Sequence, residues 1–241
     1  MITNRLKINE AADFLNISVG TLRRWDDNGK LKSLREKEEG HRYYGISQLE
    51  EFQLASCVSL ARKWTKNKIG VKPNSLFYCS DSSVFQGRLY KLRAALSKNQ
   101  EIESFFSLLI SVVGEIGDNS FAHNLGNWPD IIGIFFAYDV KKKVIVLADR
   151  GQGVLATLKR VKPDLDNDSD ALHVAFTEVI SGRAPESRGN GLKYIREVTE
   201  NNPISLSFQS GGAEINLKKG RVLKIKKVKD IIRGCLAIIK F

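Results

Sequence analysis

The stretch EIGDNSFAH, residues 115–123, follows an apolar segment and places acidic, amide and imidazole groups close together. Apolar residues before it recur every three or four positions, a spacing that predicts a helix with one buried face. Glu115, Asn119 and His123 lie four residues apart, so on a helix they should project together along the edge of that face. The alternative for Glu115 is a surface carboxylate paired with a lysine. A shared polar row favours a binding site, and the rest of the sequence indicates which kind.

The length of 241 residues is enough for two small domains or one large one. With 42% hydrophobic and 27% charged residues, the chain has the composition of a soluble protein with a sizeable core. No apolar run approaches the roughly 20 residues of a membrane-spanning helix, and the first residues lack the apolar region of a secretory signal. The three cysteines, at 57, 79 and 235, have neither disulfide-type nor metal-type spacing. We therefore expect a cytoplasmic protein with reduced thiols and no membrane contact.

The net charge of +11 is unevenly distributed. Residues 51–100 have nine Lys or Arg against two Asp or Glu, and residues 218–241 have nine against one. Residues 101–217 are mildly acidic. Basic segments attract nucleic acids or acidic surfaces. The simpler interpretation is a solvated face, and for the last segment an edge strand protected by lysines.

The first fifty residues have the pattern of two short helices joined by a tight turn. Apolar residues between 8 and 15 share one helical face. Ser18 is placed to cap a second helix whose buried side includes Leu22 and Trp25, and Gly29 is typical of the position just after a helix. The outward side of this second helix would consist of Thr21, Arg23 and Arg24.

This segment resembles the winged helix-turn-helix of the MerR and excisionase families over residues 5–55. The shared motifs are EAA at 10–12, TLRRW at 21–25, and Gly, Arg and Tyr at 40, 42 and 44. The resemblance implies that the second helix enters the major groove of double-stranded DNA. It assigns DNA contacts to Thr21, Arg23 and Arg24 on that helix and to Arg42 and Tyr43 on the wing. A small module that binds protein is the alternative.

MerR proteins also dimerise through a long helix that follows the wing. Residues 47–68 predict a helix of only moderate length here. A homodimer is therefore an expectation that rests on the resemblance, and a further protein partner is left open.

The pattern changes beyond a linker at residues 70–73. Residues 84–96 and 102–124 predict helices, and residues 131–138 and 143–148 predict two paired strands. The second strand ends in Asp149, followed by Gly-x-Gly. Such glycines let the backbone turn tightly and a ligand approach closely.

Two helical segments come next, at 152–161 and 169–180, before a polar loop. This loop, SGRAPESRGNGL at 181–192, is rich in glycine and opens directly into a helix. Backbone N–H groups at such a helix start are well placed for phosphate. Residues 204–217 then have the pattern of a hairpin turned at a Gly-Gly pair.

The order of these motifs resembles the GHKL ATPase superfamily, which includes gyrase, histidine kinases, MutL and a class of heat-shock chaperones. The resemblance covers residues 75–217. It implies an α+β two-layer sandwich of the Bergerat type, with a mixed sheet and helices on one face. The expected domains are a winged helix-turn-helix with its following helix at 1–68 and an ATP-binding domain at 75–241, which includes the basic C-terminal strands.

The same resemblance implies ATP and Mg²⁺ as cofactors and assigns roles to individual residues. Glu115 matches the acidic residue that polarises the attacking water, and Asn119 matches the asparagine that coordinates Mg²⁺, a metal suited to oxygen ligands. Asp149 matches the aspartate that binds the adenine amino group. The glycine-rich segments supply the turn beneath the base, with Gly151 and Gly153, and the phosphate cradle, with Gly189, Asn190, Gly191 and Leu192. Ser187 stands where many members have a further glycine.

Three functions are compatible with this reading. The first is a DNA-binding regulator in which ATP–Mg²⁺ orders a lid at 181–190 and modulates DNA or partner binding, with slow ATP hydrolysis. The second is an ATPase component of a defence or repair system, and the third is a serine kinase of the anti-sigma type. A histidine kinase would need a phosphoacceptor histidine on a helical hairpin ahead of the ATP domain, and no histidine fits. Residues 218–241 are too short for the transducer domain of gyrase-like members, so hydrolysis should be slow.

Overall fold

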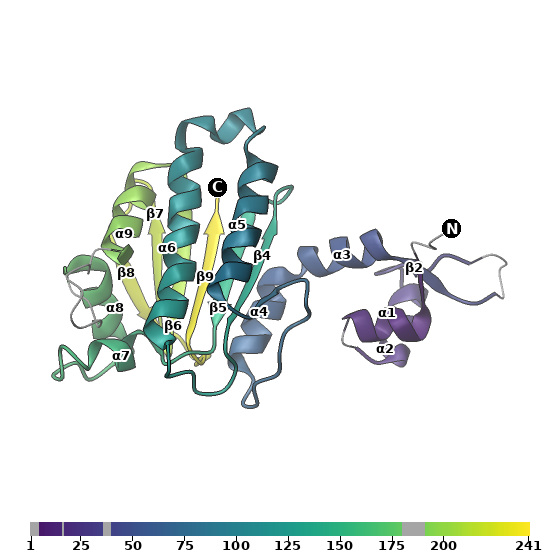
Figure 1. The fold of residues 1–241 in the computed structure, drawn as a ribbon, viewed down its shortest axis with the longest axis horizontal. Helices are drawn as coiled ribbons and strands as arrows, with labels where there is room; N and C mark the ends of the chain where they lie inside the picture. Colours follow the sequence, from purple (N-terminus) through teal and green to yellow (C-terminus); the bar gives the residue numbers. More distant parts are fainter. Residues whose placement is uncertain (1–4, 16, 36–39, 180–190) are drawn as a thin grey trace. The chain divides into compact units, whose positions relative to one another are not determined.

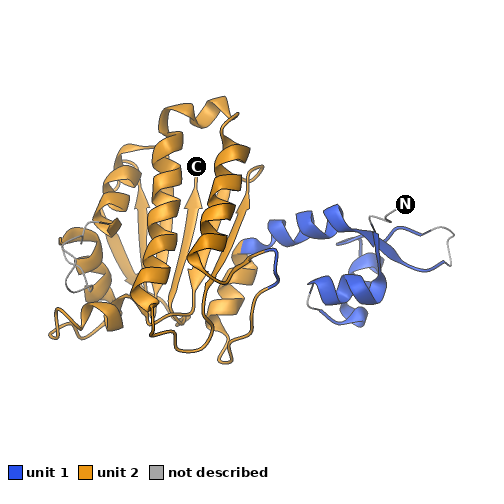
Figure 2. Ribbon diagram, in the orientation of Figure 1, with its two compact units in different colours: residues 1–57, 74–76 blue, residues 58–73, 77–241 orange. Residues whose placement is uncertain are grey.

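A computed structural model describes residues 5–15, 17–35, 40–179 and 191–241 of the chain. It contains two compact units, coloured separately in Figure 2: residues 1–57 with 74–76, and residues 58–73 with 77–241. This division differs from the expected boundary at 68. The helix expected over 47–68 is interrupted at Ser56, and its second half packs on the sheet of the larger unit through Ala61 and Trp64.

The smaller unit is a set of short helices with a two-stranded antiparallel sheet. Its elements are β1 (Arg5–Lys7), α1 (Ile8–Leu15), α2 (Val19–Asp27), β2 (Tyr43–Gly45) and α3 (Ile46–Ala55). Ser18 caps α2 by accepting a hydrogen bond from the Thr21 N–H at 3.1 Å, which confirms the predicted cap. Leu22 is fully buried against α1, as the helical spacing predicted.

A buried carboxylate joins the wing of this unit to α2. Asp26 accepts hydrogen bonds from Arg42 at 2.7 Å, from Arg35 at 2.8 Å and from the backbone and hydroxyl of Ser33. Burial alone would raise the pKa of Asp26, but these hydrogen bonds hold it well below its ordinary value. The charge on Asp26 therefore holds Ser33 and Arg35, which follow α2, together with Arg42, which precedes β2.

The larger unit is built on a seven-stranded sheet (Figure 1). Its helices are α4 (Cys57–Lys66), α5 (Ser82–Leu96), the 3₁₀ helix η1 (Gln100–Phe105), α6 (Phe106–Asn124), α7 (Gly153–Leu158), α8 (Asp168–Thr177) and α9 (Gly191–Asn201). Its strands are β3 (Tyr78–Cys79), β4 (Ile134–Asp139), β5 (Val144–Asp149), β6 (Ser205–Ser210), β7 (Ala213–Lys218), β8 (Lys224–Lys227) and β9 (Cys235–Lys240). The chain is thus α+β with a small helical domain at its N-terminus, as expected.

The strand order is β3-β4-β5-β9-β6-β7-β8, and every pairing is antiparallel. The expected mixed sheet is therefore wrong. The helical connection from β5 to β6 leaves those two strands pointing the same way, which would make them a parallel pair if they were neighbours. The last strand, β9, lies between them and runs opposite to both.

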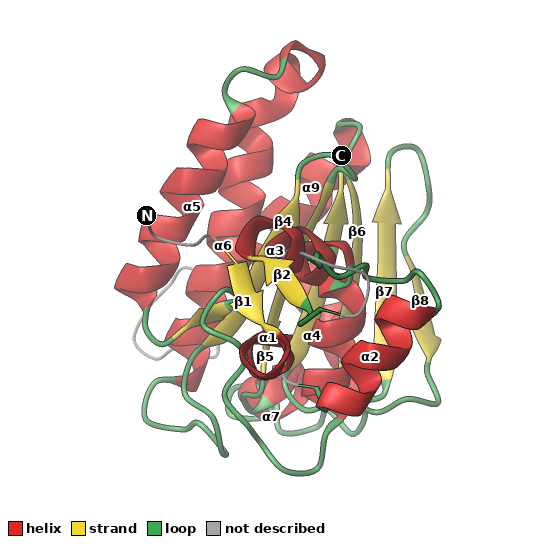
Figure 3. Cartoon of the chain, turned by 90° about the vertical axis from the view of Figure 1, so that its right-hand side faces the viewer, coloured by secondary structure: helices red, strands yellow, loops and turns green. Residues whose placement is uncertain are grey.

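Helices cover both faces of this sheet, so the expected two-layer arrangement is incomplete. On one face, Phe136 packs against Phe85 of α5 and Phe208 against Phe176 of α8. Figure 3 shows α5 and α6 on one side of the strands. On the other face, Phe135 packs against Trp64 of α4, with ring centroids 6.3 Å apart. Among the described residues, no helix is both long and apolar enough to cross a membrane.

Helix α6 carries the stretch EIGDNSFAH. Gly117, the third residue of that stretch, sets how closely α5 approaches α6. A Cβ atom at Gly117 would lie 2.1 Å from Cζ of Phe85, so only glycine allows this packing. Leu109, Val112, Val113 and Ile116 form the buried stripe that the spacing predicted. The polar residues of α6 are held in place by this apolar packing.

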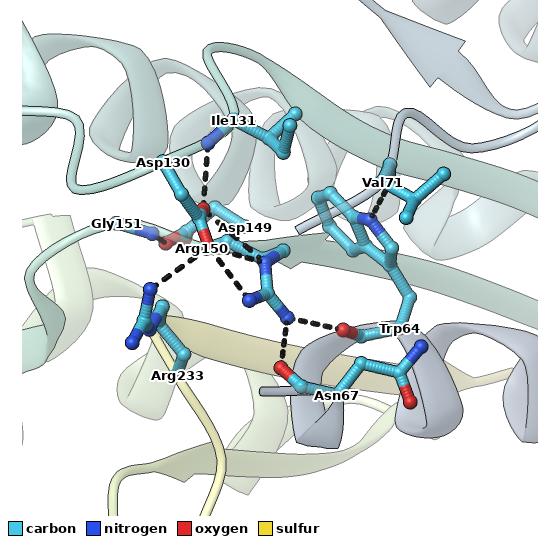
Figure 4. A network of polar contacts seen from close by, with 9 residues as sticks. All are labelled: Trp64, Asn67, Val71, Asp130, Ile131, Asp149, Arg150, Gly151 and Arg233. Carbon is cyan, nitrogen blue, oxygen red and sulfur yellow. Dashed lines mark hydrogen bonds and ion pairs between the residues drawn. The ribbon is translucent and has the colours of Figure 1, made fainter. Parts of the chain in front are cut away.

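A fully buried arginine connects β5 to the helix on the opposite face (Figure 4). Arg150 follows Asp149 directly, and strand alternation points it away from the side on which Asp149 lies. Its guanidinium donates to the backbone carbonyls of Trp64 and Asn67, at the end of α4. It also donates to both carboxylate oxygens of Asp130, with the shortest distance 2.6 Å. One side chain therefore satisfies the carbonyls at a helix end and pairs with a carboxylate.

Asp130 joins a third segment to the same network. Arg233, in the loop before β9, donates to Asp130 at 2.8 Å, and its backbone N–H donates to the Thr65 carbonyl at 3.0 Å. Burial would raise the pKa of Asp130, but the hydrogen bonds and charges of Arg150 and Arg233 keep it below its ordinary value. The network ties the loop after β5, the loop before β9 and the end of α4 together.

We expect Arg150→Met to lower the free energy of unfolding of the larger unit by about 3–5 kcal/mol, because it leaves buried groups without their charged partner. Arg233→Met is the matched control: it removes another contact to Asp130 from a side chain that is 45% exposed, so its effect should be about 0–1 kcal/mol. Guanidinium chloride unfolding, followed by tryptophan fluorescence, measures both. Equal losses in the two variants would show that the buried arginine has no special structural role.

Candidate functional site

The carboxylate of Asp149 is the most enclosed polar group of the candidate site. It lies at the end of β5 and is 2% exposed. One oxygen accepts a hydrogen bond from the hydroxyl of Ser120 at 2.9 Å, and the other accepts from the N–H of Gly151 at 2.8 Å. The N–H of Cys235 and the amide of Asn124 also contribute. A strand end, helix α6 and the last strand therefore surround one carboxylate.

The surroundings of Asp149 change its protonation. Burial raises its pKa to about 6, and the hydrogen bonds from Gly151, Ser120, Cys235 and Asn124 limit the rise. A raised pKa means that burial makes the charged form unfavourable. A ligand that donates a hydrogen bond to this carboxylate would stabilise its charged form.

Glu115 and Asn119 form a second polar group, about one helical turn before Ser120 and Asn124 on α6. The amide nitrogen of Asn119 donates to Oε1 of Glu115 at 2.9 Å, which directs the amide oxygen away from that carboxylate. Gly191, the first residue of α9, packs directly on this pair. A Cβ atom at Gly191 would lie 1.9 Å from Oε1 of Glu115 and 3.0 Å from Nδ2 of Asn119. The helix start with its N–H groups therefore faces the acidic and amide side chains.

Helix α6 connects these two groups. Asn119 and Ser120 are consecutive residues, and Ser120 is the hydrogen-bond partner of Asp149. The structure thus brings together Glu115, Asn119 and Gly191 on one side and Asp149 with Gly151 on the other. Gly153 begins α7, and Leu192 is partly buried against the core. Gly189 and Asn190, and the expected lid at 181–190, lie outside the described residues.

Sequence reasoning missed Ser120, Asn124 and Cys235 as partners of Asp149. Ser120 and Asn124 are four residues apart on the polar edge of α6, a spacing that could have indicated a shared contact. The N–H of Gln152 donates to the side-chain oxygen of Asn124 at 2.8 Å, so Asn124 also fixes the turn after Asp149. No sequence signal identifies Cys235, because its position depends on how β9 enters the sheet.

Asp118 points elsewhere. It is exposed and accepts a hydrogen bond from Gln86 of α5 at 2.8 Å. In the part of the chain that the structure describes, no group of three or more His, Cys, Asp or Glu side chains is arranged to hold a metal ion. A metal at Asn119 would therefore take most of its ligands from water or from a bound ligand, as Mg²⁺ commonly does.

The candidate DNA-binding residues of the smaller unit differ in their availability. Arg23 and Arg24 are exposed on α2. The Thr21 hydroxyl lies 2.9 Å from that of Ser18, within the helix cap. On the wing, Arg42 is held by Asp26 and Asp27, and Tyr43 lies beneath the guanidinium of Arg5 at 4.4 Å. In this structure Arg42 and Tyr43 stabilise the wing, and their contact with DNA stays a prediction.

Comparison with known proteins identifies the smaller unit. Residues 7–44 match the family described as MerR family regulatory protein. The type II methyltransferase M.Eco47II of Escherichia coli is 44% identical over 55 residues, which are 23% of this chain and 13% of the methyltransferase. The chain therefore spans only a small part of that protein's length. The α1–α2 pair, its serine cap and its wing belong to a MerR-type helix-turn-helix domain.

Proposed function

We propose that this protein is a DNA-binding regulator whose larger unit binds ATP and Mg²⁺ and thereby modulates DNA or partner binding by the MerR-type domain. The observation that carries the nucleotide part is the single helix α6, which presents Glu115 and Asn119 to the start of α9 and Ser120 to the buried carboxylate of Asp149. The DNA part rests on the MerR-type domain at 7–44.

The residues present fit this ligand chemically. A buried carboxylate that is poorly solvated favours a hydrogen-bond donor such as the amino group of adenine. Asn119 offers an amide oxygen, a hard ligand for Mg²⁺. Gly191 has no side chain, so the Glu115–Asn119 pair packs directly against the backbone at the start of α9, where N–H groups favour an anionic ligand. When bound, Mg²⁺ would be held by Asn119 and would neutralise charge on the ATP phosphates.

Glu115 is the residue we assign to hydrolysis. Its carboxylate is held by the Asn119 amide, which fixes its position beside the start of α9. A carboxylate in that place can accept a proton from the water that attacks the terminal phosphorus, while the bond from that phosphorus to the oxygen of the leaving ADP breaks. We infer slow hydrolysis, with Glu115 as the base. Any effect of ATP on DNA binding also requires that ATP binds two states of the protein with different affinity.

The protonation of Asp149 provides a test of nucleotide binding. Its pKa of about 6 predicts that the affinity for a fluorescent ATP analogue rises with pH and levels off above about 7. At pH 5 about nine-tenths of the carboxylate is protonated, so affinity should be about tenfold below the plateau. In the absence of ligand, the free energy of unfolding should change with pH in the opposite direction. It should fall as pH rises from about 4 to 6, because in that range Asp149 is still protonated in the folded state but has lost its proton in the unfolded state.

Asp149→Asn is the control for that measurement, because it keeps the shape but has no titrating group. The phosphates of the analogue titrate equally with both proteins, so only the difference between the two pH profiles reports on Asp149. Identical profiles for the wild type and the variant, measured by fluorescence anisotropy at fixed Mg²⁺, would reject Asp149 as a nucleotide ligand.

Hydrolysis is tested by Glu115→Gln, which keeps the hydrogen bond to Asn119 within reach but removes the base. Steady-state phosphate release should fall by about 10²–10⁴-fold. ATP-analogue binding should change by less than about threefold, which separates catalysis from binding. An unchanged turnover number in the variant, or no release above background in the wild type, would remove hydrolysis from the proposal.

DNA binding is tested with a duplex selected from a random-sequence pool. Arg23→Ala/Arg24→Ala should weaken its binding by about 10- to 100-fold if these side chains reach base edges. Lys7→Ala/Lys32→Ala is the matched control, since it removes two exposed charges from the same unit. Mobility-shift titrations with and without ATP–Mg²⁺ also measure the coupling. Equal weakening by both variants would argue against recognition by α2, and equal affinities with and without nucleotide would argue against regulation by ATP.

A further inference from the structure

The second face of the large sheet is only partly covered by α4. Where α4 covers it, the residues are apolar and buried, as Phe135, Val146 and Leu236 show. The same face continues over β6, β7, β8 and the end of β9 and becomes mainly polar, with exposed lysines and partly exposed serines. We call this part the lysine face and define it by Ser205, Ser207, Asn216, Lys218, Lys224, Lys226 and Lys240.

Strand register places these side chains on one surface, because residues paired across antiparallel strands point to the same side. Ser205 of β6 pairs with Lys240 on one neighbour and with Lys218 on the other. Strands lie about 4.8 Å apart, so this row spans about 10 Å. In the next row, Asn216 pairs with Ser207 and with Lys224. Lys226 occupies the row after that, opposite Glu214.

The lysine face has a clear excess of positive charge. On β6 to β9, Glu214 is the carboxylate in these rows, and Lys226 pairs with it at 3.0 Å. The row of Lys240 continues across Val144 to Asp139 on β4, two strands away. Within the described ranges, Lys218, Lys224 and Lys240 have no ion-pair partner, and all three are exposed. The turn between β7 and β8 adds the exposed cations Lys219 and Arg221. This surface therefore carries more positive than negative charge. Its serine hydroxyls add hydrogen-bond donors, and the Asn216 amide donates to Glu214 at 2.9 Å.

Protection of an edge strand explains only part of this arrangement. Lysines on β8, the outermost strand, would discourage pairing with another chain. Lys240 lies on β9, between β5 and β6 in the interior of the sheet, where there is no edge to protect. Lys218 and Lys240 share a row across three strands, so the positive charge follows the face and not only the edge.

We propose that the lysine face is a second DNA-contacting surface, which binds the phosphates of duplex DNA without reading its sequence. Lysine ammonium groups neutralise phosphates, and hydroxyl and amide groups donate hydrogen bonds to them. Duplex DNA is the polyanion we assign because the same chain carries a MerR-type domain. The lysine face adds affinity and salt dependence, while specificity comes from α2.

The test compares two variants of the full chain with the same change in net charge. Lys218→Gln/Lys224→Gln/Lys240→Gln removes three charges of the lysine face. Lys91→Gln/Lys98→Gln/Lys159→Gln removes three exposed charges of the same unit that lie elsewhere. Fluorescence anisotropy over a NaCl series gives the dissociation constant and its salt slope on a non-specific duplex. For the lysine-face variant, the slope of the logarithm of the binding constant against the logarithm of the salt concentration should become smaller by about 2.7 in magnitude. Its binding at 0.15 M salt should be about 10- to 100-fold weaker. The control should match the wild type.

The outcomes separate this inference from recognition by α2. In the background of Arg23→Ala/Arg24→Ala, residual non-specific binding that disappears with the lysine-face substitutions supports the inference even if specific recognition proves to reside elsewhere. Equal slopes for the lysine-face and control variants overturn it. The inference is also overturned if the lysine-face substitutions weaken binding to single-stranded RNA but not to duplex DNA, since the surface would then bind a different nucleic acid. Circular dichroism verifies that each variant is folded.

Discussion

The buried guanidinium of Arg150 is the interaction on which the rest of the larger unit depends. A fully buried positive charge is expensive unless it is paired and hydrogen-bonded. Asp130 supplies the pairing, and the carbonyls of Trp64 and Asn67 supply the hydrogen bonds. Because these partners come from separate segments, the cost of burying Arg150 is offset only when the loop after β5 and the end of α4 are both in place. Asp149, the last residue of β5 and the direct neighbour of Arg150, is positioned by the same constraint.

Helix α6 then divides its polar edge between two tasks. Ser120 and Asn124 face the strand end, where they hold Asp149 and the turn after it. Glu115 and Asn119 face the start of α9. The close packing of Phe85 on a glycine of α6 holds the helix against its neighbour. A candidate site is therefore built from one rigid helix and the backbone of two strand and helix ends, an arrangement that limits side-chain motion.

The charge of the chain follows the same architecture. Acidic residues gather in the part that includes the candidate site, whereas the basic C-terminal segment forms the outer strands of the sheet and its exposed face. The proposed nucleotide and the proposed DNA both carry phosphates, which attract the same cations. In the larger unit, the lysine face and the Asp149 site lie on opposite faces of the sheet.

The sequence by itself determined the local elements: the serine cap of α2, the buried stripe of α6, the hairpin of β6 and β7, and the four-residue spacing of Glu115 and Asn119. These depend on contacts between near neighbours, which periodicity and capping residues reveal. Only the tertiary structure decided that β9 enters between β5 and β6 and that Lys218 and Lys240 share a row. It also decided that Ser120 meets Asp149 and that Arg150 binds the carbonyls at the end of α4. Each of these depends on strand register and on residues far apart in the chain, and local patterns carry no information about such pairings.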